Sequence, residues 1–107
     1  MYKILLACGA GCSSGLVAQS MRKYAKKCKI DCLIKAVGDA DIINCISEYD
    51  VLMLGPHLKY SLPKIENYVK KSGLPVLVQT ITKDQYAMLD GEGVLKDAIK
   101  LLEEGKV

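Results

Sequence analysis

Short apolar runs and segments of helical periodicity alternate four times along this chain. The apolar runs span residues 3–7, 32–37, 50–54 and 76–80, and turn-forming or polar residues bound them. Such short runs are typical of buried strands. Between them, apolar residues recur mainly at steps of three and four, which predicts one buried helix face in each segment. The predicted helices span about 14–28, 39–46, 61–73 and 93–104, with a helical turn at 82–88.

This alternation predicts an α/β fold with one parallel sheet and helices on both of its faces. Right-handed crossovers favour the strand order 2-1-3-4, the flavodoxin-like arrangement. A length of 107 residues predicts a single domain spanning 1–107, and a hydrophobic share of 50% allows a substantial core. The sequence shows no apolar run of transmembrane length and no leader of secretory type, so we expect a cytoplasmic protein.

Polar residues and glycines mark the expected ends of the helices. Ser13 or Ser14 can cap the first helix, Asp39 the second and Ser61 the third. Gly73 is expected to end the third helix, because glycine readily adopts the left-handed conformation found after helix ends.

Function is expected at the carboxyl ends of the strands, near the point between strands 1 and 3 where the strand order reverses. Two loops lie there, 8–15 and 55–61. Glycines and small side chains in the first loop allow several backbone N–H groups to converge on one point. The N-terminus of the following helix would add to the attraction for an anion. The predicted anion-binding residues are Cys8, Gly9, Ala10, Gly11, Cys12, Ser13, Ser14 and Gly15.

Cys8 opens this loop, and such a position would favour its thiolate form. A thiolate beside a phosphate site is suited to accept a phosphoryl group as a covalent nucleophile. Two alternatives stay open: Cys8 as a buried strand end, or Cys8 and Cys12 as a redox pair. A flavodoxin-like binding module without covalent chemistry is a third alternative. The odd number of cysteines argues against a disulfide framework, and we expect the remaining three in the core: Cys28, Cys32 and Cys45.

Three motifs in order resemble a known family. They are LLACGAGCSSGL around Cys8, GPHLKYSLPKI at 55–65 and LDGEGVLKDAI at 89–99. Together they resemble the enzyme IIB component of the phosphoenolpyruvate-dependent sugar phosphotransferase system, of the lactose/cellobiose (diacetylchitobiose) type. The resemblance covers nearly the whole chain. It also implies a fold similar to that of low-molecular-weight tyrosine phosphatases.

The resemblance implies a phosphoryl carrier. Cys8 would accept a phosphoryl group from a phosphohistidine of a IIA protein and pass it to a sugar bound by a membrane-embedded IIC protein. The sugar would be of the cellobiose, lactose or β-glucoside kind. The chain would need no cofactor, metal or nucleic acid, and IIC would hold it at the inner face of the membrane.

A phosphatase of similar fold would require an arginine six residues after the cysteine, where its guanidinium clamps the transition state. This chain has Ser14 there, and the next arginine, Arg22, lies well along the predicted helix. The sequence therefore predicts a phosphocysteine that resists hydrolysis.

Four further features are left with open roles. His57, the single histidine, stands where relatives often have glutamine. It is a surface residue, a polar contact to the phosphoryl group or a partner, or the phosphorylated histidine itself. Tyr60 either lines the same mouth or packs locally, and Asp90 either belongs to the site or forms a turn. The lysines at 23, 26 and 27 predict a solvated helix face, with a contact surface for an acidic partner as the alternative.

Overall fold

The computed structural model describes residues 1–8 and 12–104, with the side chains of 12–14 left out. Its four strands are β1 (Tyr2–Cys8), β2 (Cys32–Gly38), β3 (Val51–Leu54) and β4 (Leu77–Thr80). They form one parallel sheet in the order β2-β1-β3-β4, so the predicted strand order is confirmed. The five helices are α1 (Cys12–Lys27), α2 (Ile42–Cys45), α3 (Leu62–Lys71), α4 (Lys83–Ala87) and α5 (Gly91–Glu104).

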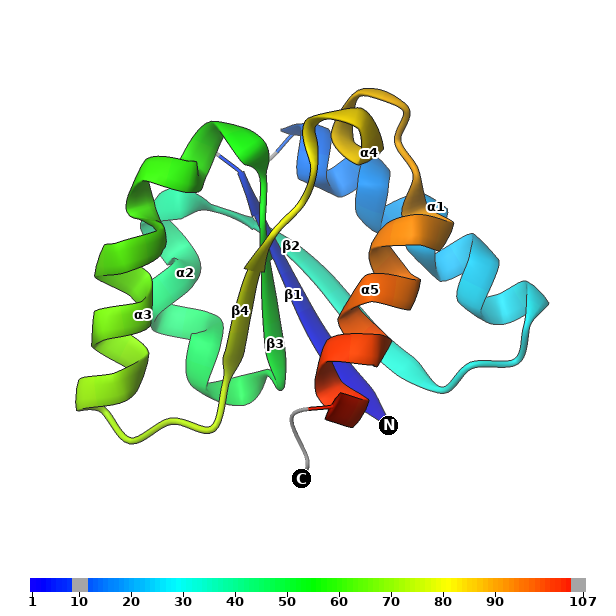
Figure 1. The fold of residues 1–107 in the computed structure, drawn as a ribbon. Coiled ribbons are helices and arrows are strands. Elements are labelled where there is room, and N and C mark those ends of the chain that lie inside the picture. The colour runs from blue at the N-terminus through cyan, green and yellow to red at the C-terminus, as the bar shows by residue number, and fades with distance from the viewer. Residues whose placement is uncertain (9–11, 105–107) are drawn as a thin grey trace.

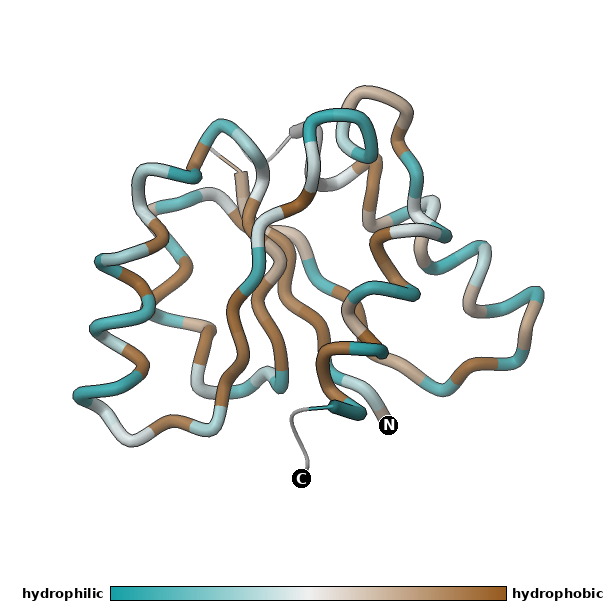
Figure 2. The backbone as a smooth tube through the Cα atoms, in the orientation of Figure 1, coloured by the Kyte–Doolittle hydropathy of each residue, from teal (hydrophilic) through white to brown (hydrophobic). Residues whose placement is uncertain are grey.

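Helices cover both faces of the sheet (Figure 1), as predicted. The alternating side chains of β1 show why: Ile4 and Leu6 pack with α1 and α5, whereas Leu5 and Ala7 pack with α2 and α3. Successive side chains of a strand point to opposite faces, so a strand that is apolar at every position requires a cover on both sides. Figure 2 shows the apolar strands between helices whose outer turns are hydrophilic.

The helices α1, α3 and α4 end in the same backbone pattern. After each helix, an N–H bonds to the carbonyl five residues earlier, as from Ile30 to Ala25 at 2.8 Å. The residue before that donor has a positive φ: Lys29 (56°), Gly73 (66°) or Leu89 (51°). This is the Schellman arrangement, in which a left-handed residue allows the last carbonyls to be satisfied. Gly73 therefore ends α3 as predicted.

The turn after α1 corrects one expectation about the cysteines. Cys28 is exposed, because the helix ends at Lys27 and the chain turns away from the core at that point. The core prediction for Cys28 is therefore wrong. Cys32 and Cys45 are partly buried and pack against the two cores, one on each side of the sheet.

The predicted helix caps differ from those observed. Helix α1 begins at Cys12, so Ser13 and Ser14 lie inside its first turn instead of capping it. Asp39 is the first residue of a short 3-10 helix, Asp39–Asp41, for which Gly38 is the cap residue. Ser61 stands at the cap position of α3 without a side-chain bond, because the 3-10 helix Pro56–Ser61 runs directly into α3. The N–H of Leu62 already bonds to the carbonyl of Lys59 there.

Candidate functional site

Cys8 is the last residue of β1, and it therefore lies at the carboxyl edge of the parallel sheet. Its neighbour in the ladder with β2 is Gly38, and the preceding Ala7 is paired with Leu54 of β3. Cys8 is buried, with 3% of its surface exposed. The sequence predicted this position, because the strand pattern ends there and the strand order reverses beside it.

Gly55 brings the chain after β3 directly against Cys8. Its N–H bonds to the carbonyl oxygen of Ala7 at 2.7 Å, which extends the ladder by one residue. A Cβ atom on Gly55 would lie 3.1 Å from that oxygen and 3.2 Å from the Cβ of Cys8. Both distances are shorter than an ordinary van der Waals contact, so a larger residue would have to displace the thiol-bearing strand end. The second predicted loop is thereby placed beside the first.

Tyr86 of α4 belongs to a third segment that packs beside Gly55. The edge of its ring, at Cε1, would lie 3.5 Å from a Cβ on Gly55. The ring also meets the imidazole of His57 edge to face, with centroids 5.6 Å apart and planes at 84°. Aromatic pairs favour this arrangement. The sequence analysis did not select Tyr86, and no signal in the short 82–88 segment would have done so.

Tyr86 is held by a well-defined helix start. Thr82 accepts a hydrogen bond from the N–H of Gln85 at 3.1 Å, and the Gln85 side chain accepts one from the N–H of Thr82 at 3.2 Å. This reciprocal pair is a capping box. Gln85 also donates to the carboxylate of Asp97 on α5 at 2.7 Å, which ties the short helix to the core.

Most of the predicted anion-binding loop lies outside the described residues. Gly9, Ala10 and Gly11 fall there entirely, as do the side chains of Cys12, Ser13 and Ser14. Gly15 belongs to the first turn of α1, and a Cβ on it would have no atom within 4 Å. A helix of this length, starting four residues after Cys8, presents unbonded N–H groups and a positive field at its first turn. The anion site itself stays a prediction.

Arg22 is engaged away from Cys8. Its Nε and Nη2 donate to the carbonyl oxygen of Ile34 on β2, at 3.2 and 2.5 Å. The guanidinium therefore ties α1 to an edge strand. It is not in the position of a phosphatase clamp, in agreement with the sequence analysis.

The motif around Asp90 has a structural explanation. The Asp90 carboxylate accepts from the N–H of Gly93 at 3.0 Å and so caps α5. A Cβ on Gly91 would lie 2.4 Å from the backbone nitrogen of Met21, so only glycine allows α5 to approach α1 this closely. Helix α5 begins at Gly91, two residues before the predicted start at residue 93. Asp90 is thus a helix cap, and the reading of Asp90 as a site residue has no support in its contacts.

Tyr60 is 76% exposed, so the expectation of local packing is wrong. His57 is also exposed, although its ring contacts Tyr86. Cys32 differs from Cys8 in its surroundings: burial, together with the charge of Asp31, raises the pKa of the Cys32 thiol. A raised pKa disfavours the nucleophilic thiolate.

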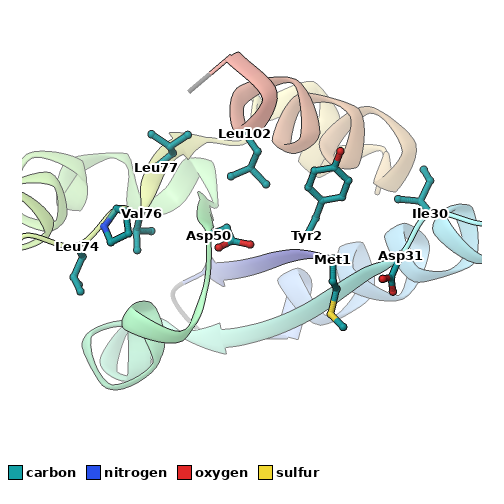
Figure 3. A pocket seen from close by; sticks show the side chains of 10 residues that line it. Met1, Tyr2, Ile30, Asp31, Asp50, Leu74, Val76, Leu77 and Leu102 are labelled. Carbon is teal, nitrogen blue, oxygen red and sulfur yellow. The ribbon is translucent and has the colours of Figure 1, made fainter. Parts of the chain in front are cut away.

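A hollow on the described surface lies at the opposite, amino-terminal edge of the sheet (Figure 3). It has a volume of about 820 Å³, and its lining includes Tyr2, Asp50, Leu74 and Leu102. In the part of the chain that the structure describes, no three His, Cys, Asp or Glu side chains form a metal-binding group. Among the same residues, no helix is long and apolar enough to cross a membrane.

Comparisons with known proteins agree with this arrangement. The oligo-β-mannoside-specific EIIB component of Bacillus subtilis (strain 168) is 28% identical over 95% of this chain and 97% of its own length. The galactose-specific EIIB component of Lactococcus lactis subsp. cremoris (strain MG1363) is 34% identical over 92% of this chain and 94% of its own length.

A solved structure shows the same fold. The cellobiose-specific IIB component from Borrelia burgdorferi superimposes with a TM-score of 0.77 at 28% identity, over 97% of this chain and 94% of that chain. The sequence pattern of one family, described as the PTS system, lactose/cellobiose specific IIB subunit, matches residues 3–97. The chain therefore belongs to the lactose/cellobiose-specific IIB family of the sugar phosphotransferase system.

Proposed function

We propose that Cys8 carries the phosphoryl group in this IIB chain. The observation that supports the proposal most is its position: Cys8 ends the central strand at the carboxyl edge, four residues before the start of α1. A nucleophile there meets the N-terminal field of the helix, which favours both a thiolate and the phosphoryl group added to it. The family to which the chain belongs consists of phosphotransferase components.

The proposed reaction has two displacements at phosphorus. The Cys8 thiolate attacks the phosphorus of a phosphohistidine on a IIA protein, so the S–P bond forms and the N–P bond breaks. The histidine leaves with the electron pair of the broken bond and takes up a proton from solvent. A sugar hydroxyl oxygen bound by IIC then attacks the same phosphorus. The O–P bond forms, the S–P bond breaks, and Cys8 returns to the thiolate as the hydroxyl proton is released.

The predicted loop would hold the phosphoryl group through backbone N–H groups of Gly9, Ala10, Gly11, Cys12, Ser13, Ser14 and Gly15. Backbone donors at a helix N-terminus bind an anion without a bound metal or cofactor. The absence of an arginine at position 14 and the engagement of Arg22 with Ile34 both favour transfer over hydrolysis. A stable phosphocysteine can wait for its acceptor.

The proposed partners are a phosphorylated IIA protein and a membrane-embedded IIC protein, which would place this chain at the cytoplasmic face of the membrane. The relatives are named for oligo-β-mannoside, galactose and cellobiose. We accordingly propose a substrate in the galactoside or β-linked oligosaccharide class, chosen by IIC. The comparisons do not favour the alternative of a Cys8–Cys12 redox protein.

The test is intact mass after incubation with phosphoenolpyruvate, the two general phosphotransferase proteins and a lactose/cellobiose-type IIA. The wild-type chain should gain the mass of one phosphoryl group, and Cys8→Ser should gain none. Cys32→Ser is the matched control, because it removes a thiol from the neighbouring strand at the opposite end of the sheet, and it should gain the group. Uptake by Cys8→Ser, or no uptake by the wild type from several such IIA proteins, would overturn the proposal.

A further inference from the structure

His57 and Tyr86 lie at the carboxyl edge, and the carrier function assigns a role to neither of them. His57 is the only histidine in the chain. It lies in the 3-10 helix Pro56–Ser61, which follows β3, whereas Tyr86 comes from α4, after β4. The segments that follow β3 and β4 thus bring an imidazole and a phenol ring to the edge of the sheet where β1 ends at Cys8.

Gly55 provides the geometric link between these side chains and Cys8. A single Cβ position on Gly55 lies 3.2 Å from the Cβ of Cys8 and 3.5 Å from the ring edge of Tyr86. The cysteine and the tyrosine ring are thus separated by little more than the space that one methyl group would fill. His57 follows Gly55 by two residues and rests against the same ring.

The segment that holds His57 is anchored to the core by its neighbour Leu58. Leu58 is 2% exposed and packs into the core on the α2 and α3 side. Its N–H bonds to the carbonyl of Gly55 at 2.9 Å, which closes the turn. With Leu58 fixed inward, the neighbouring His57 stays on the exposed side, and the edge-to-face contact with Tyr86 restricts its ring.

The imidazole has the chemistry that a phosphocysteine calls for. A phosphoryl group brings nearly two negative charges and several acceptor oxygens to the buried strand end. An imidazole donates one N–H when neutral and two when protonated, so it can bind a phosphoryl oxygen in either state. A hydrogen bond to a charged group is stronger than one between neutral groups.

We propose that His57 contacts the phosphoryl group on Cys8 and that Tyr86 is a positioning residue that holds the imidazole toward it. The proposal rests on the proposed function of Cys8. In this arrangement His57 supplies a side-chain N–H donor to the phosphoryl group. His57 stabilises the phosphorylated chain without serving as a phosphoryl acceptor itself.

The expected consequence is a shift in the phosphoryl equilibrium between the IIA protein and this chain. His57→Ala should lower the ratio of phosphorylated to unphosphorylated chain about tenfold, the effect of one hydrogen bond to a charged group. His57→Gln retains a side-chain N–H donor and should restore part of the loss. Tyr86→Leu should lower the ratio about threefold by releasing the imidazole. Lys59→Ala, which removes a charge from the same 3-10 helix, is the matched control and should match the wild type.

Nuclear magnetic resonance separates a phosphoryl contact from a merely structural role. Because the chain has one histidine, its ring nitrogen signals need no assignment. Those signals should move when the wild type is phosphorylated, and the ³¹P signal of the phosphocysteine should move in His57→Ala but not in Lys59→Ala. Unmoved histidine signals, together with a wild-type equilibrium ratio in His57→Ala, would overturn this inference and leave the carrier function standing. A wild type that takes up no phosphoryl group would instead overturn the carrier function.

Discussion

The two edges of the sheet differ in shape and in the side chains that they present to a ligand. The amino-terminal edge has a hollow of about 820 Å³, which opens between the strand starts and the end of α5. The carboxyl edge has a buried cysteine, a glycine pressed against it and an aromatic pair at the mouth. We nevertheless propose the carboxyl edge as the site of phosphoryl transfer. A carrier receives a small group from another protein, so it needs a reachable nucleophile and backbone donors more than a deep cavity.

Charge sharpens the contrast. Asp31 and Asp50 line the hollow at the amino-terminal edge, and two carboxylates there disfavour a phosphoryl group. At the carboxyl edge, the first turn of α1 provides a positive field and His57 provides an N–H donor. In an open α/β sheet the position of the loops therefore indicates the site more reliably than the size of a hollow does.

The largest effect is expected from a substitution that crowds the carboxyl edge at Gly55. In Gly55→Val the new side chain would push against the Ala7 carbonyl and the Cys8 side chain, because the space measured at Cβ is already short. We expect the free energy of unfolding to fall by about 1–3 kcal/mol, the usual cost of overpacking. Phosphoryl uptake should fall more than stability alone explains. Urea unfolding and intact mass measure the two effects.

Gly38→Val provides the control for Gly55→Val. Gly38 lies on the same edge, paired with Cys8, and has a similar extended backbone, with φ of −78° against −60° for Gly55. A Cβ on Gly38 would meet no atom within 4 Å, so the variant should remain near wild type in both measurements. Equal losses in the two variants would contradict the role given to the close approach at Gly55.

Substitutions at the amino-terminal edge should change the free energy of unfolding and leave phosphoryl uptake unchanged. The Asp50 carboxylate accepts from the N–H of Lys3 at 3.0 Å, at an exposed position. Asp50→Ala removes this acceptor and should lower the free energy of unfolding by about 0.5–1 kcal/mol, with phosphoryl uptake unchanged. Asp31→Ala is the control, because Asp31 bonds to Tyr2 through its backbone carbonyl, which the substitution keeps. A loss of phosphoryl uptake in Asp50→Ala would indicate that the hollow takes part in the transfer. It would contradict the assignment of the transfer to the carboxyl edge alone.

The smallest expected effect is a pH dependence at the same edge. The Tyr2 hydroxyl donates to Glu103, and this hydrogen bond is the main cause that raises the pKa of Tyr2 above 10.0. The folded chain therefore keeps the phenol proton where the unfolded chain has lost it. This contribution to stability is fully present below pH 10 and disappears as the pH rises through the folded-state pKa.

Glu103→Gln should lower the pKa of Tyr2 toward its ordinary value, and phenolate absorbance follows the change. Tyr2→Phe, which keeps the ring, identifies the signal of this residue among the six tyrosines. Phosphoryl uptake by the wild type should not follow this titration. An uptake profile that did follow it would link the amino-terminal edge to the transfer.

The strand order and the position of Cys8 could be predicted because both depend on periodicity along the chain. Four apolar runs separated by helical segments leave few ways to build a parallel sheet. The surroundings of Cys8 could not be predicted, because Gly55, His57 and Tyr86 come from later segments whose meeting depends on packing. No local pattern indicates that a ring from α4 reaches the end of β1.

The other departures from the sequence analysis have local causes. Cys28 fits the helical spacing of α1, but the helix ends at Lys27, before Cys28. The chain then turns at Lys29, which adopts a positive φ. The motif at 89–99 left Asp90 either in the site or in a turn, whereas the contacts of Asp90 and Gly91 show a capped helix packed closely on α1. Sequence resemblance alone does not separate residues retained for packing from residues retained for chemistry.

The most direct measurement of the central claim is fragmentation mass spectrometry of the phosphorylated wild-type chain under conditions that preserve an S–P bond. The account predicts that the mass of one phosphoryl group appears on fragments that contain Cys8, with Cys12, His57 and Cys32 unmodified. A phosphoryl group located on His57, or on any cysteine other than Cys8, would contradict it.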